Sequence, residues 1–153
     1  MSSRIARLPS KIENRREGIR LPFFSKGVFQ MTIAEAIERI DDLKPNNYTQ
    51  HDKIVWLNQV DLLIKREIID THEDGEDIEF SGYDDETNIE TPLLVGDPYS
   101  TLYISWLETK IDYSNGEYAK YNNSATVFNT DYQNYERWYN RHHMPKGTQI
   151  KYF

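Results

Sequence analysis

A stripe of mostly apolar and aromatic residues runs through positions 104–139, at steps that alternate between three and four. Its members are Ile104, Leu107, Ile111, Ser114, Tyr118, Tyr121, Ala125, Phe128, Tyr132, Tyr135 and Tyr139. Such steps place side chains on one side of an α-helix, so the stripe predicts a continuous helical seam. Five of these eleven residues are tyrosines, whose rings can pack while their hydroxyls stay hydrogen-bonded or in water. The seam therefore indicates a helix surface that lies against other protein.

The ends of this helical region are marked by its flanking residues. Asp97-Pro98 is a strong helix start, with Asp as the N-cap and Pro at the first helical position. The pattern then continues to about His143, and Pro145 ends it. Residues 114–116 and 122–123 are weak points. One bent helix or two collinear helices both fit, because an interior glycine costs only about 1 kcal/mol relative to alanine.

Two shorter helices are predicted upstream by capping boxes, in which a threonine and an acidic residue three positions later satisfy each other's backbone amides. Thr32 with Glu35 starts a helix that ends before Pro45, and Thr49 with Asp52 starts a helix of roughly 50–72. The second helix has a broad apolar face that includes Trp56, Leu57, Val60, Leu63, Ile64 and Ile68.

The period changes in residues 77–95. Ile78 and Phe80 alternate with acids, and residues 92–95 form a short apolar run, which reads as two short strands or an extended acidic loop. The predicted fold class is therefore mainly α. It is a small helical bundle with a long C-terminal helix, bent or split, and a short β-hairpin or an extended acidic loop.

Composition narrows the possible classes of function. At 153 residues the chain is about one domain long, and it contains no cysteine, so no disulfide, thiolate nucleophile or cysteine metal site is expected. No apolar run approaches the ~18 residues of a transmembrane helix, and no secretory signal is evident. We expect no membrane partner.

Charge is distributed unevenly. The net charge is -7, yet residues 1–30 hold seven Lys and Arg against two acids, while residues 67–109 hold thirteen acids and no Lys or Arg. Residues 1–30 are either a basic arm for nucleic acid or, the interpretation we favour, a segment upstream of a natural start at Met31. The predicted organisation is thus a poorly structured basic extension (1–30), a helical domain (31–144) and a C-terminal tail (145–153).

No motif for chemistry stands out. Residues 70–75 resemble the first half of a calcium loop, but Ser81 occupies the position that needs a bidentate Glu. His142 and His143 are adjacent and do not form the i, i+4 pair of helical zinc sites. Nucleotide-binding loops and nucleophile elbows are missing from the sequence. We therefore predict no enzyme activity, with no catalytic residue, no cofactor and no metal.

The helix that carries the seam has a second aromatic flank, formed by Tyr103, Trp106, Tyr113 and Trp138. Packing within the chain is the simplest explanation of the seam itself. A helix that is apolar on two flanks must however be covered on two sides, and Tyr and Trp are favoured where proteins dock. The predicted subunit-interface residues are Trp106, Tyr118, Tyr121, Phe128, Tyr132, Tyr135, Trp138 and Tyr139.

Several stretches after Met31 resemble a family of small structural proteins encoded in tailed-phage and prophage morphogenesis clusters. They are residues 31–37, 43–46, 65–73, 115–123 and 139–147. These proteins look like the head–tail connector, or adaptor, class. The resemblance implies helical subunits in a homo-oligomeric ring, usually twelvefold, between a portal protein and a tail-side closure (stopper) protein. It also implies a place at the head–tail junction of the virion, and it defines no catalytic residues.

The resemblance suggests a role for the acidic segment and for the tail. A negative channel wall lets DNA pass without gripping its phosphates, so the predicted channel-lining residues are Asp77, Glu79, Asp84, Asp85 and Glu86, with no specific nucleic-acid readout. Adaptor tails commonly engage the portal, which makes Lys146, Ile150, Lys151, Tyr152 and Phe153 the predicted docking residues. The main alternative is a small regulatory or nucleic-acid-binding protein that uses the basic arm. A third is a phage enzyme or host-takeover factor without a readable motif.

Overall fold

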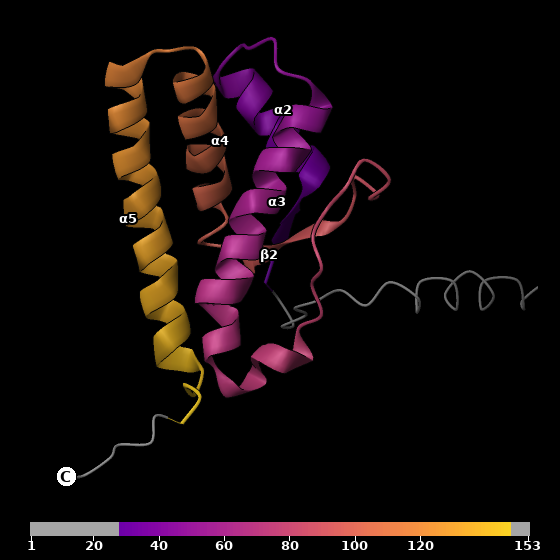
Figure 1. The fold of residues 1–153 in the computed structure, drawn as a ribbon, viewed down its shortest axis with the longest axis vertical. Coiled ribbons are helices and arrows are strands. Elements are labelled where there is room, and N and C mark those ends of the chain that lie inside the picture. The colour runs from indigo at the N-terminus through magenta and orange to yellow at the C-terminus, as the bar shows by residue number, and fades with distance from the viewer. Residues whose placement is uncertain (1–27, 148–153) are drawn as a thin grey trace, which may run out of the picture.

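The computed structural model describes residues 28–147, and this part of the chain is mainly helical (Figure 1). Four α-helices and two short 3-10 segments accompany a two-stranded sheet. In chain order the elements are β1 (Gln30–Thr32), α2 (Ile33–Leu43), α3 (Gln50–Glu67), η2 (Ile69–Thr71), η3 (Glu73–Asp77), β2 (Pro92–Gly96), α4 (Thr101–Ser114) and α5 (Tyr118–His142). The predicted class, a small helical protein with a long C-terminal helix, is confirmed.

Both predicted capping boxes are present. Thr32 and Glu35 bond reciprocally at the start of α2, and Thr49 and Asp52 do so at the start of α3. These caps satisfy backbone amides that the first helical turn leaves without partners. The second helix is shorter than predicted, because the chain tightens after Glu67 into the 3-10 segments η2 and η3.

The long C-terminal helical region is split, and its halves are antiparallel. The chain turns at Gly116, whose φ of 71° lies in the left-handed region that glycine adopts without strain. Gly116 and Glu117 donate backbone hydrogen bonds to Tyr113 and Asp112, which close the turn. α5 then packs back along α4, so the bent and collinear arrangements are both wrong (Figure 1). The single seam becomes two facing halves.

The start of this region also differs from the prediction. α4 begins at Thr101, with Ser100 at the cap position, and Asp97-Pro98 lies in the preceding turn with a cis peptide bond. Asp97 instead accepts a hydrogen bond from the Ser100 hydroxyl. The Asp-Pro pair therefore marks the turn that connects β2 with α4.

The sheet pairs segments that lie far apart in the sequence. β1 runs antiparallel to β2, with Gln30 opposite Gly96 and Thr32 opposite Pro92. No hairpin forms within 77–95, because residues 78–91 are irregular and only the apolar run 92–96 becomes a strand. The extended acidic loop is thus the alternative that the structure adopts. β1 begins at Gln30, one residue before the predicted domain boundary at Met31. The Asp97 amide also donates a hydrogen bond to the carbonyl of Phe29, which precedes this boundary as well.

The core lies where α2, α3 and α4 meet the sheet. Its fully buried side chains include Ile33 and Ile40 of α2, Leu57, Val60 and Ile64 of α3, Leu93 and Val95 of β2, and Leu102, Leu107 and Ile111 of α4. Phe128, Tyr135 and Tyr139 of α5 are also part of this cluster. α5 therefore contributes one side to the core and exposes the other.

Candidate functional site

The acidic loop forms an exposed carboxylate surface on the side of the molecule away from α5 (Figure 1). We call this surface the acidic face and define it by its exposed carboxylates, Asp77, Glu79, Asp84, Asp85, Glu86 and Glu90. All five predicted channel-lining residues belong to it. Because residues 67–109 contain no Lys or Arg, this segment cannot neutralise its own charge.

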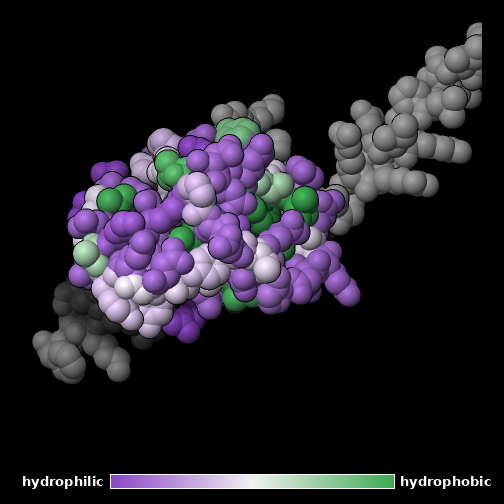
Figure 2. All heavy atoms as spheres, turned by 90° about the horizontal axis from the view of Figure 1, so that it is seen from above, coloured by the Kyte–Doolittle hydropathy of each residue, from purple (hydrophilic) through white to green (hydrophobic). Residues whose placement is uncertain are grey.

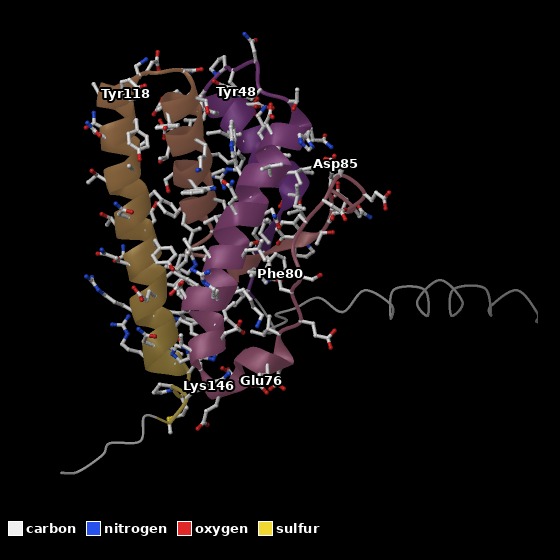
Figure 3. All side chains as sticks on the ribbon, viewed as in Figure 1. Tyr48, Glu76, Phe80, Asp85, Tyr118 and Lys146 are labelled. Atoms are coloured by element: carbon white, nitrogen blue, oxygen red, sulfur yellow. The ribbon has the colours of Figure 1, made fainter. Side chains whose placement is uncertain are left out.

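Part of the acidic face is held in a fixed shape. Asp84 accepts hydrogen bonds from the Thr87 hydroxyl (3.0 Å) and from the Glu86 amide (2.9 Å), which form a compact turn. Asp85, which Figure 3 labels on the loop, pairs with His51 of α3 at 2.7 Å, and this contact raises the pKa of His51. The remaining carboxylates of this face make no ion pair among the described residues.

The residues that follow α5 are bound to the 3-10 segments rather than projecting freely. The Glu73 amide donates to the Met144 carbonyl, and the Lys146 amide donates to the Thr71 carbonyl, each at 2.9 Å. We call this contact between residues 143–146 and 71–76 the tail clamp. Lys146 also pairs with Glu76 at 3.3 Å, and Figure 3 shows the two side by side at one end of the molecule.

The tail clamp holds one of the five predicted docking residues, Lys146, against the folded body. Lys146 belongs to the folded body, whereas Ile150, Lys151, Tyr152 and Phe153 lie outside the described residues. His143 reinforces the clamp, since it pairs with Asp74 and stacks on Tyr139 with ring centroids 3.8 Å apart. A tail that docks elsewhere would therefore start after Gly147.

Three of the eight predicted interface residues lie inside the chain. Tyr139 is fully buried and makes an edge contact with the buried His72, and Tyr135 and Phe128 are buried beside it in the core. Burial raises the pKa of both Tyr135 and Tyr139. Their rings cannot reach a partner in this conformation, which corrects their assignment as interface residues.

The other five predicted interface residues are partly or largely exposed. Tyr118 is exposed at the tip of the α4–α5 hairpin (Figure 3). Tyr113 contacts both Tyr118 and Tyr121 there. Tyr132 is half-buried, and burial raises its pKa to about 12. The remaining two residues are the half-buried tryptophans Trp106 and Trp138.

The second aromatic flank is covered largely by the chain itself. The Trp106 indole donates a 2.7 Å hydrogen bond to the Trp56 carbonyl of α3 and packs against Phe128 of α5. Trp138 stacks with Tyr135 and with His142. On one straight helix, the seam and the second aromatic flank would each need a separate partner. Because α5 folds back along α4, residues of both flanks pack against other parts of the same chain. The chain itself thus covers much of both flanks, Tyr113 stays exposed, and a subunit interface on this surface remains a prediction.

Sequence reasoning missed a buried carboxylate at the centre of the fold. Asp61 of α3 is fully buried and accepts hydrogen bonds from the hydroxyls of Tyr83 and Tyr103, each at 2.6 Å, and from the Leu94 amide at 3.2 Å. Desolvation raises the pKa of Asp61 to about 6, although the three donors lower it. Burial beside Asp61 raises the pKa of both tyrosines.

The Asp61 cluster joins four parts of the chain: α3, the acidic loop, β2 and α4. The Tyr103 hydroxyl also accepts a hydrogen bond from the Val95 amide of β2 at 2.8 Å. Asp61 is fully buried, so its carboxylate has no surface open to solvent. Its arrangement is that of a satisfied structural network.

A second buried carboxylate joins three helical segments at the other end of the bundle. Asp112 of α4 pairs with Lys44, which follows α2, and accepts a 2.9 Å hydrogen bond from the Ser124 hydroxyl of α5. Lys53 is buried as well, and it contacts Asp41 (2.6 Å) and the Tyr48 carbonyl (2.9 Å). These charges are paired, as buried charges must be.

Within residues 28–147 no group of three or more His, Cys, Asp or Glu side chains is arranged to hold a metal ion. A search of the same residues finds no helix that is both long and apolar enough to cross a membrane. The candidate functional features described above are three surfaces: the acidic face, the exposed side of α5 and the end that carries the tail clamp.

Comparison with known proteins found no match. No protein-family model fits the chain, and neither the curated proteins nor the solved structures include one that is significantly similar to it.

Proposed function

We propose that this chain is a structural subunit of a phage head–tail junction, where copies form a ring beneath the portal protein through which DNA passes. A tail-side closure protein would meet the opposite end. The observation that carries the proposal is the acidic face, a group of exposed carboxylates from a segment that contains no Lys or Arg, on a small helical body. A wall of this kind repels the phosphate backbone, so DNA could move along it without adhering.

The resemblance of residues 31–37, 43–46, 65–73, 115–123 and 139–147 to the adaptor class supports the same function. Several of these stretches coincide with structural junctions. Residues 115–123 include the turn between α4 and α5, and residues 65–73 and 139–147 contain most of the tail clamp. The resembling stretches thus include positions that determine how the chain folds back.

The proposed role of the tail can be tested by a pull-down with the portal protein encoded in the same gene cluster. Full-length protein should retain the portal, and a chain ending at Gly147 should lose it. This truncation keeps the tail clamp, so its circular dichroism and thermal midpoint should match those of the full-length chain. Lys120→Ala is the matched control: it removes an exposed ion pair with Glu117, worth less than about 1 kcal/mol, and should leave portal binding intact.

Two results would contradict the proposal. If the full-length chain does not bind the portal protein, the head–tail role is contradicted. If the truncated chain binds the portal as well as the full-length chain does, the docking role of the tail is contradicted. DNA retention that weakens with salt, and that is lost when the basic residues of 1–27 are neutralised, would instead favour the nucleic-acid-binding alternative.

A further inference from the structure

A shallow recess lies between the sheet and α5, at the point where the described chain begins. Val28, Gly96 of β2, Tyr99 of the following turn, and Tyr135 and Trp138 of α5 are among the residues that line it. We call it the aromatic recess. Its volume is about 30 Å³, which is room for about two water molecules. An occupant as large as an aromatic ring must therefore lie across its opening.

Three aromatic rings form one side of the recess. The ring centroid of Tyr99 lies 5.5 Å from that of Trp138 and 5.9 Å from that of Tyr135, and Tyr135 stacks on Trp138 at 5.9 Å. Tyr135 is buried, whereas Tyr99 and Trp138 are only half-buried, so part of each of these two rings faces solvent. Aromatic surface of this kind favours contact with a further apolar or aromatic side chain.

The register of the sheet directs the chain before Val28 toward this recess. β1 runs antiparallel to β2 with Gln30 opposite Gly96, and the Asp97 amide donates a 2.9 Å hydrogen bond to the Phe29 carbonyl. Each step toward the N-terminus therefore moves the chain further along the turn that follows Gly96. Val28 already packs closely there, since a Cβ on Gly96 would lie 2.4 Å from its Cγ1 atom. The chain before Val28 thus continues from the wall of the aromatic recess.

The residues that precede Val28 include a compact apolar group. Leu21, Phe23 and Phe24 lie four to seven positions before Val28, and the two phenylalanines are the only aromatic residues among residues 1–27. An extended chain spans about 3.3 Å per residue, so Phe24 can lie up to about 13 Å from Val28 and Leu21 up to about 23 Å. Both distances are ample for a recess that Val28 itself lines.

The far end of the molecule is a poorer match for this group. Tyr118 and Trp138 stand twenty positions apart on α5, which corresponds to about 30 Å and exceeds the reach of Leu21. Figure 2 looks down on the end where Figure 3 labels Tyr118. Hydrophilic residues cover most of that end, and its hydrophobic residues form small separate groups.

One buried polar atom beside the recess has no partner. The side-chain amide nitrogen of Gln30 is buried and finds no hydrogen-bond acceptor among residues 28–147. The Gln30 Cγ atom would lie 3.7 Å from a Cβ on Gly96, so this side chain passes the glycine that lines the recess. A buried donor without an acceptor is unfavourable, and a chain segment that covered the recess would bring backbone carbonyls to it.

We propose that Leu21, Phe23 and Phe24 of the same chain lie across the aromatic recess and cover the exposed parts of Tyr99 and Trp138. The contact removes apolar surface from water on both sides and adds aromatic pairs to the existing group of three rings. It joins the start of the chain to the C-terminal half of α5, on either side of the sheet edge.

The contact gives residues upstream of Met31 a place in the fold. A chain that began at Met31 would lack this contact, and it would also lack Gln30 of β1 and the Phe29 carbonyl that binds Asp97. The inference goes beyond the proposed function, because it uses neither the acidic face nor the residues after Gly147. The head–tail role and the contact can therefore fail separately.

Two variants of the full-length chain test the contribution of the contact to stability. The first carries Phe23→Ser and Phe24→Ser. The matched control carries Ile5→Ser and Ile12→Ser, which replace two apolar residues of the same N-terminal segment that the proposal does not use. The first variant should lower the thermal midpoint by about 4 °C or more, and the control should stay within about 1 °C of wild type. Circular dichroism should show that both variants are folded.

NMR of the wild-type chain locates the contact directly. Nuclear Overhauser effects should connect ring protons of Phe23 or Phe24 with ring protons of Tyr99 or Trp138. In a mixture of isotope-labelled and unlabelled chains, filtered spectra report only contacts between copies, and the same connections should be missing from them. This second spectrum distinguishes a segment that covers its own chain from one that is exchanged with a neighbour.

Four results would overturn the inference. They are phenylalanine rings without contact to Tyr99 or Trp138, contacts that appear only between copies, a thermal midpoint that the two serine substitutions leave unchanged, and an equal loss in the control. Contacts of Phe23 or Phe24 with another surface, such as the ring of Phe80, count as the first result. The portal pull-down tests the proposed function separately, because neither variant alters the tail.

Discussion

Tyr103 of α4 donates a 2.6 Å hydrogen bond to Asp61 of α3, and both side chains are fully buried. The same tyrosine hydroxyl accepts from the Val95 amide, so one contact connects two helices and the sheet. A buried carboxylate with three donors stabilises a single arrangement of these elements, because every alternative leaves a polar group unsatisfied.

Asp61 should make stability depend on pH in an unusual direction. Its pKa rises from 3.8 to about 6 on folding, so the folded chain holds the extra proton between these values. The unfolding free energy contributed by Asp61 therefore falls as pH rises from about 4 to about 6, and it is level above that. A shift of about two pKa units corresponds to about 3 kcal/mol.

Asp61→Asn removes this contribution. Its deficit in unfolding free energy relative to wild type should shrink by about 3 kcal/mol between pH 4 and pH 7, as measured by urea unfolding. Tyr103→Phe removes a hydrogen bond that lowers the pKa of Asp61, so the carboxyl should titrate at higher pH by NMR. A deficit that is the same at every pH would show that Asp61 does not titrate in this range.

Glycine substitutions should have graded effects on stability. Alanine at Gly75 would overlap the Ile69 carbonyl oxygen, which is backbone and cannot move aside, so a loss of about 2–3 kcal/mol is expected. Alanine at Gly116 meets no neighbour but must adopt a φ of 71°, at a cost of about 1–2 kcal/mol. Gly147→Ala meets neither obstacle and is the control. Thermal unfolding should rank the three in this order, and an equal loss at all three sites would contradict it.

The buried hydroxyl of Ser124 should contribute measurably to the stability of the α4–α5 hairpin. Ser124→Ala removes the hydrogen bond to Asp112 and should lower the unfolding free energy by about 1 kcal/mol. Thr126→Ala, two residues further along α5, removes only an exposed bond to its own helix and should change the unfolding free energy by less than about 0.5 kcal/mol. Urea unfolding of the two variants side by side measures the difference. Similar losses would mean that the Ser124 bond does not connect the helices.

Local features could be predicted from the sequence because their chemistry is local. The capping boxes at Thr32 and Thr49 each need only two side chains at fixed spacing, and both form. Gly116 is different. A glycine inside a helix and one that reverses the chain look alike in sequence, and packing of the two halves decides between them. The sheet could not be predicted either, because β1 has only three residues and its partner strand β2 lies far away in the sequence.

The Asp61 cluster left a signal that could have been used. Asp61 lies in register with Ile54, Leu57, Ile64 and Ile68, all buried, so it interrupts an otherwise apolar helical stripe. A carboxylate at such a position requires partners. Its donors, Tyr83 and Tyr103, come from other segments, and no spacing rule identifies them. The exposed acids of residues 77–90 followed directly from composition, whereas the burial of Tyr135 and Tyr139 depended on the reversal at Gly116.

The tail clamp has a mechanical consequence. A pull on the chain beyond Gly147 acts first on the contact between residues 143–146 and 71–76, and only afterwards on the end of α5. The two backbone hydrogen bonds and the His143–Asp74 pair there must break before the helix is loaded. Tension on the tail would thus be transmitted to η2 and η3 beside the core. Force spectroscopy with the load applied at the C-terminus should show a small early extension before the main unfolding event.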